Sequence, residues 1–263
     1  MMNKKNLVDL YAKNGKIDSD ELRLSEAGTI VFFGRSGIGK TALCDQLIRE
    51  RKYVFRHNLK SLFLVYGSWQ QKTYGKWREI FKNDFRAHQG WSEGLSAQIF
   101  KGRNEKSELM LLILDDISHQ ITQKQFQEEI LNMINVSATH NNTVIFLLSQ
   151  QLIMGGSQGG VLRSITRNSS GIVLFENPLD GIALRTLSQN IFAGEKKPGT
   201  ALASVLELNS IFNGRYLFID LHATSPISTN ACDITCKKKL LRLKSSFYTE
   251  RVYKGEEKMR VYL

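Results

Sequence analysis

The chain has 263 residues, of which 42% are hydrophobic and 23% are charged. This balance is typical of folded globular proteins and excludes a largely disordered chain. Lys and Arg total 36 against 25 Asp and Glu, a formal net charge of +11, which favours polyanionic partners such as nucleic acid. Three cysteines, an odd number, argue against a secreted disulfide framework and favour a reducing compartment.

Residues 1–27 are polar and charged and lack the apolar core of a secretory signal. The longest apolar runs, 109–114 and 144–148, are strand-sized and fall far short of the ~20 residues that cross a bilayer. We therefore expect an intracellular protein with no membrane segment. Residues 1–27 are predicted to form an N-terminal arm, and residues 28–263 a single domain, because no repeat or Gly/Ser/Pro-rich linker interrupts them.

The expected domain opens with a strand, a loop and a helix. Thr29–Phe33 is a β-branched and aromatic run between two glycines, which is typical of a strand buried on both faces. Thr41–Arg51 then has helical character. Further strands are predicted at the other short apolar runs, Ser61–Tyr66, Leu109–Leu114, Thr143–Leu148 and Gly171–Phe175.

Segments with helical spacing alternate with these strands. Apolar residues in Gln123–Asn135 recur at helical intervals, with Thr122 available as an N-cap. After Pro178, the predicted elements are a helix, a polar turn and a last strand, at Gly181–Phe192, Glu195–Thr200 and Tyr216–Leu221. The alternation predicts an α/β fold with a mainly parallel central sheet flanked by helices.

A complete phosphate-binding loop, GRSGIGKT, lies between the first strand and the first helix. Its glycines let successive backbone N–H groups point at phosphate oxygens, helped by the N-terminus of the helix that follows. Lys40 is expected to reach the terminal phosphates of ATP, and the Thr41 hydroxyl to bind Mg²⁺. The predicted nucleotide-binding residues are Gly34, Arg35, Ser36, Gly37, Ile38, Gly39, Lys40 and Thr41.

An acidic pair ends the run LLILDD, where a buried strand is predicted. An NTPase needs a carboxylate at such a strand end to hold the magnesium shell, and Asp115 is predicted to supply it. Asp116 is predicted to activate the attacking water as a general base. An Asp pair can also simply cap the next helix, but the phosphate-binding loop makes the catalytic interpretation the stronger one.

Two further sets of polar residues follow. Gln150 comes at the end of the run TVIFLLSQ, where an open α/β sheet presents its ligand crevice, and is predicted to sense the γ-phosphate or orient the water. The alternative is an ordinary polar residue at the start of a loop. Arg163 and Arg167 follow a glycine-rich loop at 155–160 and are candidates for an arginine finger offered to a neighbouring subunit, with surface arginines as the alternative.

Aromatic and basic residues elsewhere could contact nucleic acid. The stretch Lys237–Lys244 interleaves lysines with leucines and could present one face to phosphate, although a solvated surface accounts for it equally well. Trp69, Trp77 and Trp91 could stack on bases. Packing within the core is the favoured interpretation for these three side chains.

Taken in order, the motifs resemble those of the viral genome-packaging ATPases related to the poxvirus enzyme. Members of this group occur in Polinton-like elements, virophages and adintovirus-like genomes, within the FtsK/HerA superfamily. The segments that carry the resemblance are FFGRSGIGKT, VYGSWQ (Val65–Gln70), LLILDDI (Leu111–Ile117), TVIFLLSQQLI (Thr143–Ile153), RSITRNSSGIVLFENPLD (Arg163–Asp180) and YLFIDLHATSP (Tyr216–Pro226). The glycine-rich loop at 155–160 and residues 1–27 depart from the pattern of the group.

The resemblance implies a RecA-like (ASCE-type) P-loop NTPase fold, with ATP and Mg²⁺ as cofactors. It implies a homo-oligomeric ring that hydrolyses ATP and translocates double-stranded DNA into a preformed capsid, with capsid proteins as partners. It also implies the roles given above to Asp115, Asp116 and Gln150, and prefers Arg163 to Arg167 as the finger. The expected location is the host nucleus or a cytoplasmic virus factory, with association to the virion as an alternative.

Two other functions fit a strand, P-loop and helix. A nucleotide kinase begins in the same way, but the acids about 75 residues after the loop and Gln150 on a further strand are more typical of hydrolysing motors. A nucleotide-dependent switch would hold DNA or a capsid component without turnover. Asp116 discriminates between a switch and a motor, because only hydrolysis needs a water activator.

Overall fold

The structure, a computed structural model, describes the larger part of the chain. The described residues are 27–55, 57–104, 106–121, 123–150, 164–165, 168–175, 181–191, 216–220 and 241–242. They belong to two compact units, one spanning Arg23–Ile172 and the other containing the described residues from Val173 onward. The predicted division into an arm at 1–27 and one domain at 28–263 stays a prediction.

Five parallel strands form the sheet of the first unit, in the order β3-β2-β4-β5-β1. The strands are β1 (Gly28–Phe33), β2 (Leu59–Tyr66), β3 (Phe85–Gln89), β4 (Leu109–Asp115) and β5 (Thr143–Ser149). Every residue of β4 and β5 is buried, which explains why both sequences are unbroken apolar runs without alternation. Because β5 lies between β1 and β4, the carboxyl ends of these three strands are neighbours at one edge of the sheet.

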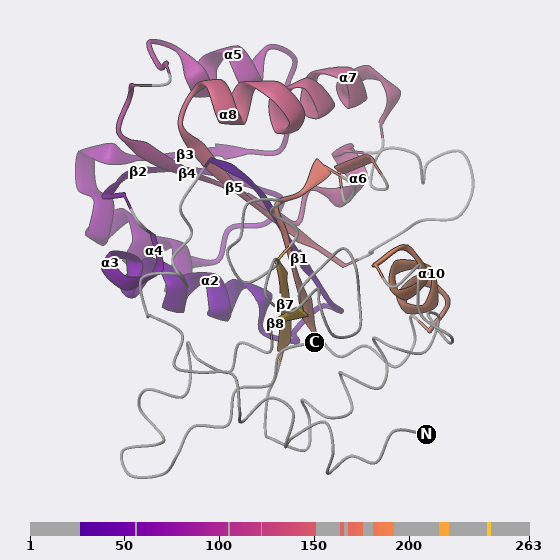
Figure 1. Ribbon diagram of the computed structural model, residues 1–263. Helices are drawn as coiled ribbons and strands as arrows, with labels where there is room; N and C mark the ends of the chain where they lie inside the picture. Colours follow the sequence, from indigo (N-terminus) through magenta and orange to yellow (C-terminus); the bar gives the residue numbers. More distant parts are fainter. Residues whose placement is uncertain are drawn as a thin grey trace, which may run out of the picture. The chain divides into compact units, whose positions relative to one another are not determined.

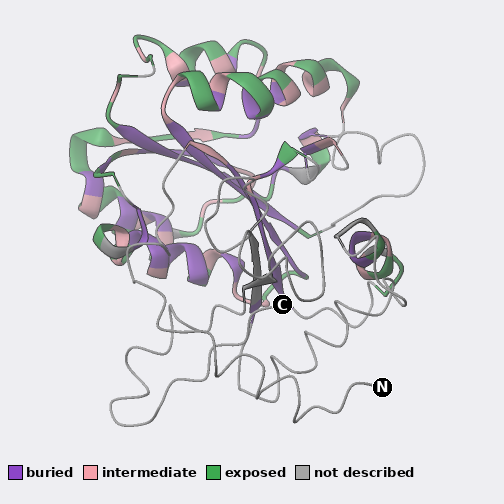
Figure 2. Cartoon of the chain, in the orientation of Figure 1, coloured by how far each residue is buried: buried purple, intermediate pink, exposed green. Residues whose placement is uncertain are grey.

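Helices cover both faces of this sheet, as Figure 1 shows. One face carries α2 (Lys40–Arg49), α3 (Arg51–Val54) and α4 (Gln71–Phe81), and the other carries α5 (Leu95–Phe100), α7 (Lys124–Asn132) and α8 (Ala138–His140). The short helix α6 (Ser118–Ile121) follows β4. The strands β1, β4 and β5 are buried almost throughout, whereas the outward faces of the helices are exposed (Figure 2). This is the predicted α/β arrangement, a RecA-like P-loop fold.

Each face of the sheet packs against its helices through side chains that alternate along the strands. On the face covered by α5, α7 and α8, one buried cluster contains strand and helix residues together. The strands contribute Phe63, Leu112 and Ile145, and the helices contribute Leu95 and Ile130. On the opposite face, the rings of Phe32 and Phe146 lie 4.9 Å apart, and the ring of Phe55 stacks 6.2 Å from that of Phe146. The core thereby fixes the strand ends that carry the candidate site.

The predicted elements of this unit are confirmed, with small changes at their ends. The helix predicted at 123–135 begins at Lys124 and continues beyond Asn132 as a π-helical segment, Met133–Ser137, into α8. Its predicted cap Thr122 lies outside the described residues. Strand β3 was not predicted, since FRAHQ lacks an apolar pattern and its residues are half-buried or exposed. Helices α4 and α5 and the 3-10 turn Lys82–Asp84 were not predicted either.

The second unit contains elements near the predicted ones. They are β6 (Gly171–Phe175, which begins in the first unit), α10 (Gly181–Ile191), β7 (Tyr216–Asp220) and β8 (Leu241–Arg242). Strands β7 and β8 pair antiparallel, and the rings of Phe175 and Tyr216 lie 5.8 Å apart. The strand β8 is all that is described of the basic stretch 237–244. Within the described parts of the chain, no helix has the length and apolar character needed to span a membrane.

Candidate active site

The phosphate-binding loop joins β1 to α2 and lies against the end of β5. The Gly34 N–H donates to the Ser149 carbonyl at 3.2 Å, so the loop starts beside the strand that leads to Gln150. Gly37 and Gly39 have φ values of 74° and 109°, in the region that residues with a Cβ rarely adopt. A Cβ at either position would meet no atom within 4 Å, so the backbone dihedral, and not crowding, requires glycine there.

Lys40, the first residue of α2, points its ammonium group back into this loop. Only 8% of its surface is exposed, and Nζ donates to the carbonyls of Gly34 and, at 3.0 Å, Arg35. A lysine ammonium has three donors, so one remains for a phosphate oxygen. Burial lowers the pKa of Lys40, and the charges of Asp115 and Asp116 oppose that shift.

Asp115, the last residue of β4, is held by two hydroxyl groups. Its Oδ2 accepts hydrogen bonds from Thr41 Oγ1 at 3.0 Å and from the Tyr74 hydroxyl at 2.8 Å, and 5% of the residue is exposed. Burial raises the pKa of Asp115, while the hydrogen bonds from Tyr74 and Thr41 act in the opposite direction. The carboxylate is therefore fixed by donors from α2 and α4.

The donor atoms at this point suit a magnesium ion. Thr41 and Asp115 bring two kinds of oxygen together at 3.0 Å, and Mg²⁺ prefers oxygen ligands. In the part of the chain that the structure describes, no group of three or more His, Cys, Asp and Glu residues could hold a metal ion. Mg²⁺ commonly takes one or two carboxylates and completes its shell with water and substrate phosphates, so the residues present fit the predicted Mg²⁺ and ATP.

Asp116 differs sharply from its neighbour. It is exposed and has a φ of 59°, a left-handed conformation that Asp tolerates better than most residues. This turn ends β4 and separates the two carboxylates. Gln150 Nε2 lies 3.4 Å from Asp116 Oδ1, a long hydrogen bond between the ends of β4 and β5. The two residues predicted to act on water are thus adjacent.

Gly67, directly after β2, makes the turn at Asp116 possible. Its N–H donates to the Asp115 carbonyl at 2.9 Å. A Cβ at Gly67 would lie 2.4 Å from the carbonyl oxygen of Asp116, which is far inside van der Waals contact. Any side chain at this position would displace the backbone that carries the acidic pair. Gly67 lies in the segment VYGSWQ, but the sequence alone indicated no such contact.

Tyr74 was also missed by the sequence analysis, although it contacts the site directly. It is fully buried in α4, and its ring lies in a group with Tyr66, Trp69 and Trp77 at centroid distances of 5.1–5.9 Å. Burial, together with the charge of Asp115, raises the pKa of Tyr74, so the hydroxyl keeps its proton and remains a donor. A tyrosine in a polar helical segment carries no distinctive sequence signal.

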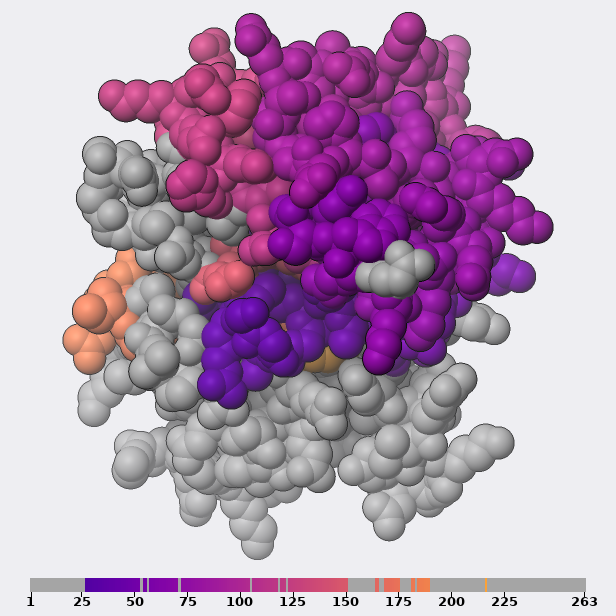
Figure 3. All heavy atoms as spheres, turned by 180° about the vertical axis from the view of Figure 1, so that it is seen from behind, coloured from indigo at the N-terminus to yellow at the C-terminus, as the bar shows by residue number. Residues whose placement is uncertain are grey.

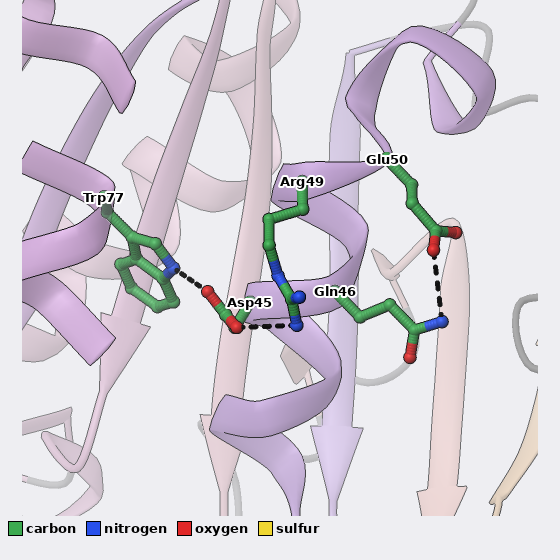
Figure 4. Close-up of polar contacts among 5 residues, drawn as sticks. All are labelled: Asp45, Gln46, Arg49, Glu50 and Trp77. Atoms are coloured by element: carbon green, nitrogen blue, oxygen red, sulfur yellow. Dashed lines mark hydrogen bonds and ion pairs between the residues drawn. The ribbon is translucent and has the colours of Figure 1, made fainter. Parts of the chain in front are cut away.

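Helix α4 is also bound to α2 by a polar contact, shown in Figure 4. Trp77 Nε1 donates to Asp45 Oδ1 at 3.1 Å, and Arg49 pairs with the other oxygen of Asp45 at 2.9 Å. The favoured packing role of the tryptophans is confirmed for Trp77 and Trp91, which are 0% and 6% exposed. Because α4 touches both α2 and Asp115, it braces the loop helix against the acidic strand.

The structure therefore brings Lys40, Thr41, Asp115, Asp116 and Gln150 to one edge of the sheet. Figure 3 shows the end of β5, in salmon, beside the indigo segment that contains the loop. Arg35 and Ser36 are exposed, and Ile38 is half-buried. The finger candidates Arg163 and Arg167, and the glycine-rich loop at 155–160, lie outside the described residues. The roles assigned to the site residues stay predictions.

The chain matches no model of a protein family, and no curated protein matches it. Several solved structures are similar to it. The DNA-packaging ATPase B204 from Sulfolobus turreted icosahedral virus is 14% identical, covering 76% of this chain and 94% of its own, with a TM-score of 0.49. The genome packaging NTPase B204 from Sulfolobus turreted icosahedral virus 2, in complex with ATP-gammaS, is 13% identical over 76% and 93% of the two chains, with a TM-score of 0.46. The cytoplasmic domain of the Thermomonospora curvata type VII secretion ATPase EccC is 16% identical over 75% of this chain and 24% of that one, with a TM-score of 0.47.

Proposed function

We propose that this protein is an ATP-hydrolysing motor that translocates double-stranded DNA and packages a viral genome into a preformed capsid. The observation that carries the nucleotide part of the proposal is the hydrogen bond of 3.0 Å between Thr41 and Asp115. It brings an oxygen atom from the end of the phosphate-binding loop next to an oxygen atom from the end of β4. Oxygen atoms of these two kinds are the ligands that a magnesium ion prefers. When bound, ATP would supply the phosphoanhydride bond that is hydrolysed, and Mg²⁺ would supply positive charge that neutralises the phosphates.

In this proposal the loop residues bind and orient the triphosphate. The backbone N–H groups of the loop and the N-terminus of α2 attract phosphate oxygens, and the remaining donor of Lys40 adds a positive charge. Thr41 and Asp115 would hold the metal shell. Asp115 is kept in place by its bond from Tyr74, so little reorganisation is needed when substrate arrives.

The hydrolytic step is assigned to Asp116 and Gln150. The exposed carboxylate of Asp116 can accept a proton from water, and the Gln150 amide, 3.4 Å away, can orient that water. The proton moves from water to Asp116 while the water oxygen forms the new bond to the γ-phosphorus and the bond to ADP breaks. An arginine from a neighbouring subunit, Arg163 in preference to Arg167, would stabilise the charge that develops.

The DNA, ring and capsid parts of the proposal rest on the formal charge of +11, which favours a polyanion, and on the ordered motifs of the packaging ATPases. The finger residue makes each active site incomplete without a second copy, which requires a homo-oligomer. Capsid proteins would then anchor the ring. We propose that the protein acts in the host nucleus or in a virus factory.

Measuring ATP turnover with and without double-stranded DNA tests this function. The purified chain should hydrolyse ATP and do so faster with DNA, and the stimulation should weaken with rising salt, because phosphate contacts release counterions. Lys40→Ala should abolish turnover. Turnover that is unaffected by Lys40→Ala would refute the assigned site, and turnover without any response to DNA would refute the motor.

A further inference from the structure

A cavity lies at the amino ends of the parallel strands, opposite the carboxyl ends that carry the phosphate-binding loop. Its volume is about 410 Å³. Basic side chains from three places meet in it: Lys60 near the start of β2, Arg86 near the start of β3, and Lys101 and Arg103 just after α5. The amino ends of the parallel strands thus form a pocket that no part of the proposed hydrolysis uses.

The two arginines of this pocket are held in place by the backbone. Arg86 Nη2 donates to the Ile99 carbonyl at 3.2 Å, and its guanidinium lies 4.9 Å from the centre of the Phe63 ring. Arg103 Nη2 donates to the carbonyls of Glu108 and, at 3.3 Å, Asn141. Both guanidinium groups are therefore ordered before any ligand arrives, which reduces the entropy lost on binding.

Arg103 retains a donor that nothing in the described part of the chain satisfies. Its Nε is buried and has no hydrogen-bond partner there. A buried donor without a partner costs about 1–3 kcal/mol, so such atoms are rare and call for an explanation. A ligand acceptor that enters the pocket would satisfy this N–H.

The charges of the pocket point to an anion. Burial, and after it the positive charge of Arg86, lowers the pKa of Arg103, while the charge of Glu108 acts in the opposite direction. Among the described residues, no carboxylate forms an ion pair with either arginine. The lining holds four basic residues and two acidic ones, Asp84 and Glu108, which leaves an excess of two positive charges and a salt-dependent attraction for anions.

We propose that this pocket binds a phosphate group between Arg86 and Arg103. Guanidinium groups match phosphate oxygens with paired hydrogen bonds, and the exposed Lys60 and Lys101 add charge at the rim. The phosphate belongs either to a small phosphorylated molecule or to the backbone of DNA. The inference is independent of the proposed ATP site, because it uses none of the residues assigned to ATP.

The direct test observes the two arginines themselves. Pyrophosphate is titrated into ¹⁵N-labelled protein, and the side-chain Nε–H signals of Arg86 and Arg103 are followed by NMR, after assignment with Arg86→Lys and Arg103→Lys. We expect both signals to shift together and to saturate. The same titration in the Lys40→Ala protein should give the same curve, which separates this pocket from the phosphate-binding loop and from any failure of the proposed function.

A charge-reversal variant provides the second measurement. Lys60→Glu with Lys101→Glu changes two exposed side chains and should weaken pyrophosphate binding at these signals at least about tenfold. The matched control, Lys52→Glu with Lys124→Glu, changes two exposed lysines outside the pocket and should alter the affinity by less than about twofold.

Repeating the titration with a short duplex DNA identifies the source of the phosphate. Shifts with DNA indicate the DNA backbone, whereas shifts with pyrophosphate alone indicate a small phosphorylated ligand. Arginine signals that do not respond to either probe, or equal losses in the variant and the control, would overturn the proposal.

Discussion

The hydroxyl of Tyr74 donates a buried hydrogen bond of 2.8 Å to Asp115, 41 residues away in the sequence. It shares the acceptor Oδ2 with Thr41. The carboxylate predicted to hold the magnesium shell is thus positioned from outside the phosphate-binding loop. Groups that orient metal ligands in this way strongly affect metal affinity.

Removing this hydroxyl should lower the affinity of the site for Mg²⁺ while leaving the fold intact. Tyr74→Phe keeps the ring among its aromatic neighbours but deletes one of the two donors to Asp115. We expect the Mg²⁺ concentration needed for half-maximal binding of a fluorescent ATP analogue to rise roughly tenfold, with little change in binding without Mg²⁺. Tyr66→Phe, a change in the adjacent ring, is the control. An unchanged Mg²⁺ requirement in Tyr74→Phe would show that the bond is only structural.

Gly67 should not tolerate a methyl group. The added Cβ of Gly67→Ala would meet the Asp116 carbonyl at 2.4 Å, so the turn that carries the acidic pair must move. Such overpacking costs about 1–3 kcal/mol of stability, and ATP turnover should fall by more than the loss of folded protein. Gly181→Ala, where a Cβ would meet no atom within 4 Å, is the matched control. Chemical denaturation and ATPase rates measure both effects, and wild-type turnover in Gly67→Ala would contradict the expectation.

Asp116→Asn should separate nucleotide binding from hydrolysis. The variant keeps the size of the side chain and the turn but cannot accept a proton from water. We expect ATP to bind with near wild-type affinity while turnover falls by about 10²–10⁴-fold. Asp115→Asn should instead impair Mg²⁺-dependent binding. If Asp116→Asn preserved turnover and its stimulation by DNA, Asp116 would not be the general base and a nucleotide-dependent switch would gain support.

Glu129 should make the free energy of unfolding depend on pH in the acidic range. From α7 its carboxylate accepts hydrogen bonds from the N–H of Ser96 at 2.9 Å, and from the N–H of Gly94 and Trp91 Nε1 at 3.3 Å each. Although burial acts to raise it, the pKa of Glu129 is lowered, mainly by the bonds from Ser96 and also by those from Trp91 and Gly94.

A carboxyl group with a lowered pKa in the folded state stabilises the fold above its unfolded pKa, about 4.3 for Glu. That contribution is lost as the pH falls through the folded pKa. Glu129→Gln should therefore be less stable than wild type at neutral pH, and the difference should shrink in acid. Urea unfolding across this range measures it. The neighbouring Glu128→Gln, at an exposed position, should show no such trend, and a constant difference for Glu129→Gln would refute the assignment.

Much of the first unit and of its site could be predicted because the signals are local. The continuous apolar runs of β4 and β5 reflect burial on both faces, and the loop GRSGIGKT needs glycine at Gly37 and Gly39 for its own backbone conformation. Parallel strands place their carboxyl ends at one edge, so Asp115, Asp116 and Gln150 could be expected near the loop. Their adjacency depends on the strand order β4-β5-β1, which the alternation of strands and helices does not give and the structure does.

Only the tertiary structure decided which residues surround that site. Tyr74 reaches Asp115 from α4, a helix that packs against β2 and β3, and Gly67 matters because the backbone of Asp116 passes close to it. Strand β3 has a single neighbour in the described sheet and a weak apolar pattern. Its extended conformation is therefore stabilised by backbone pairing with β2, which its own sequence does not indicate. Arg86 and Arg103 come together in the same way, from segments with no shared motif. Local conformation and burial can be predicted from residues that are close in the sequence. Contacts between separate helices and strands depend on how those elements pack, which no short stretch of sequence determines.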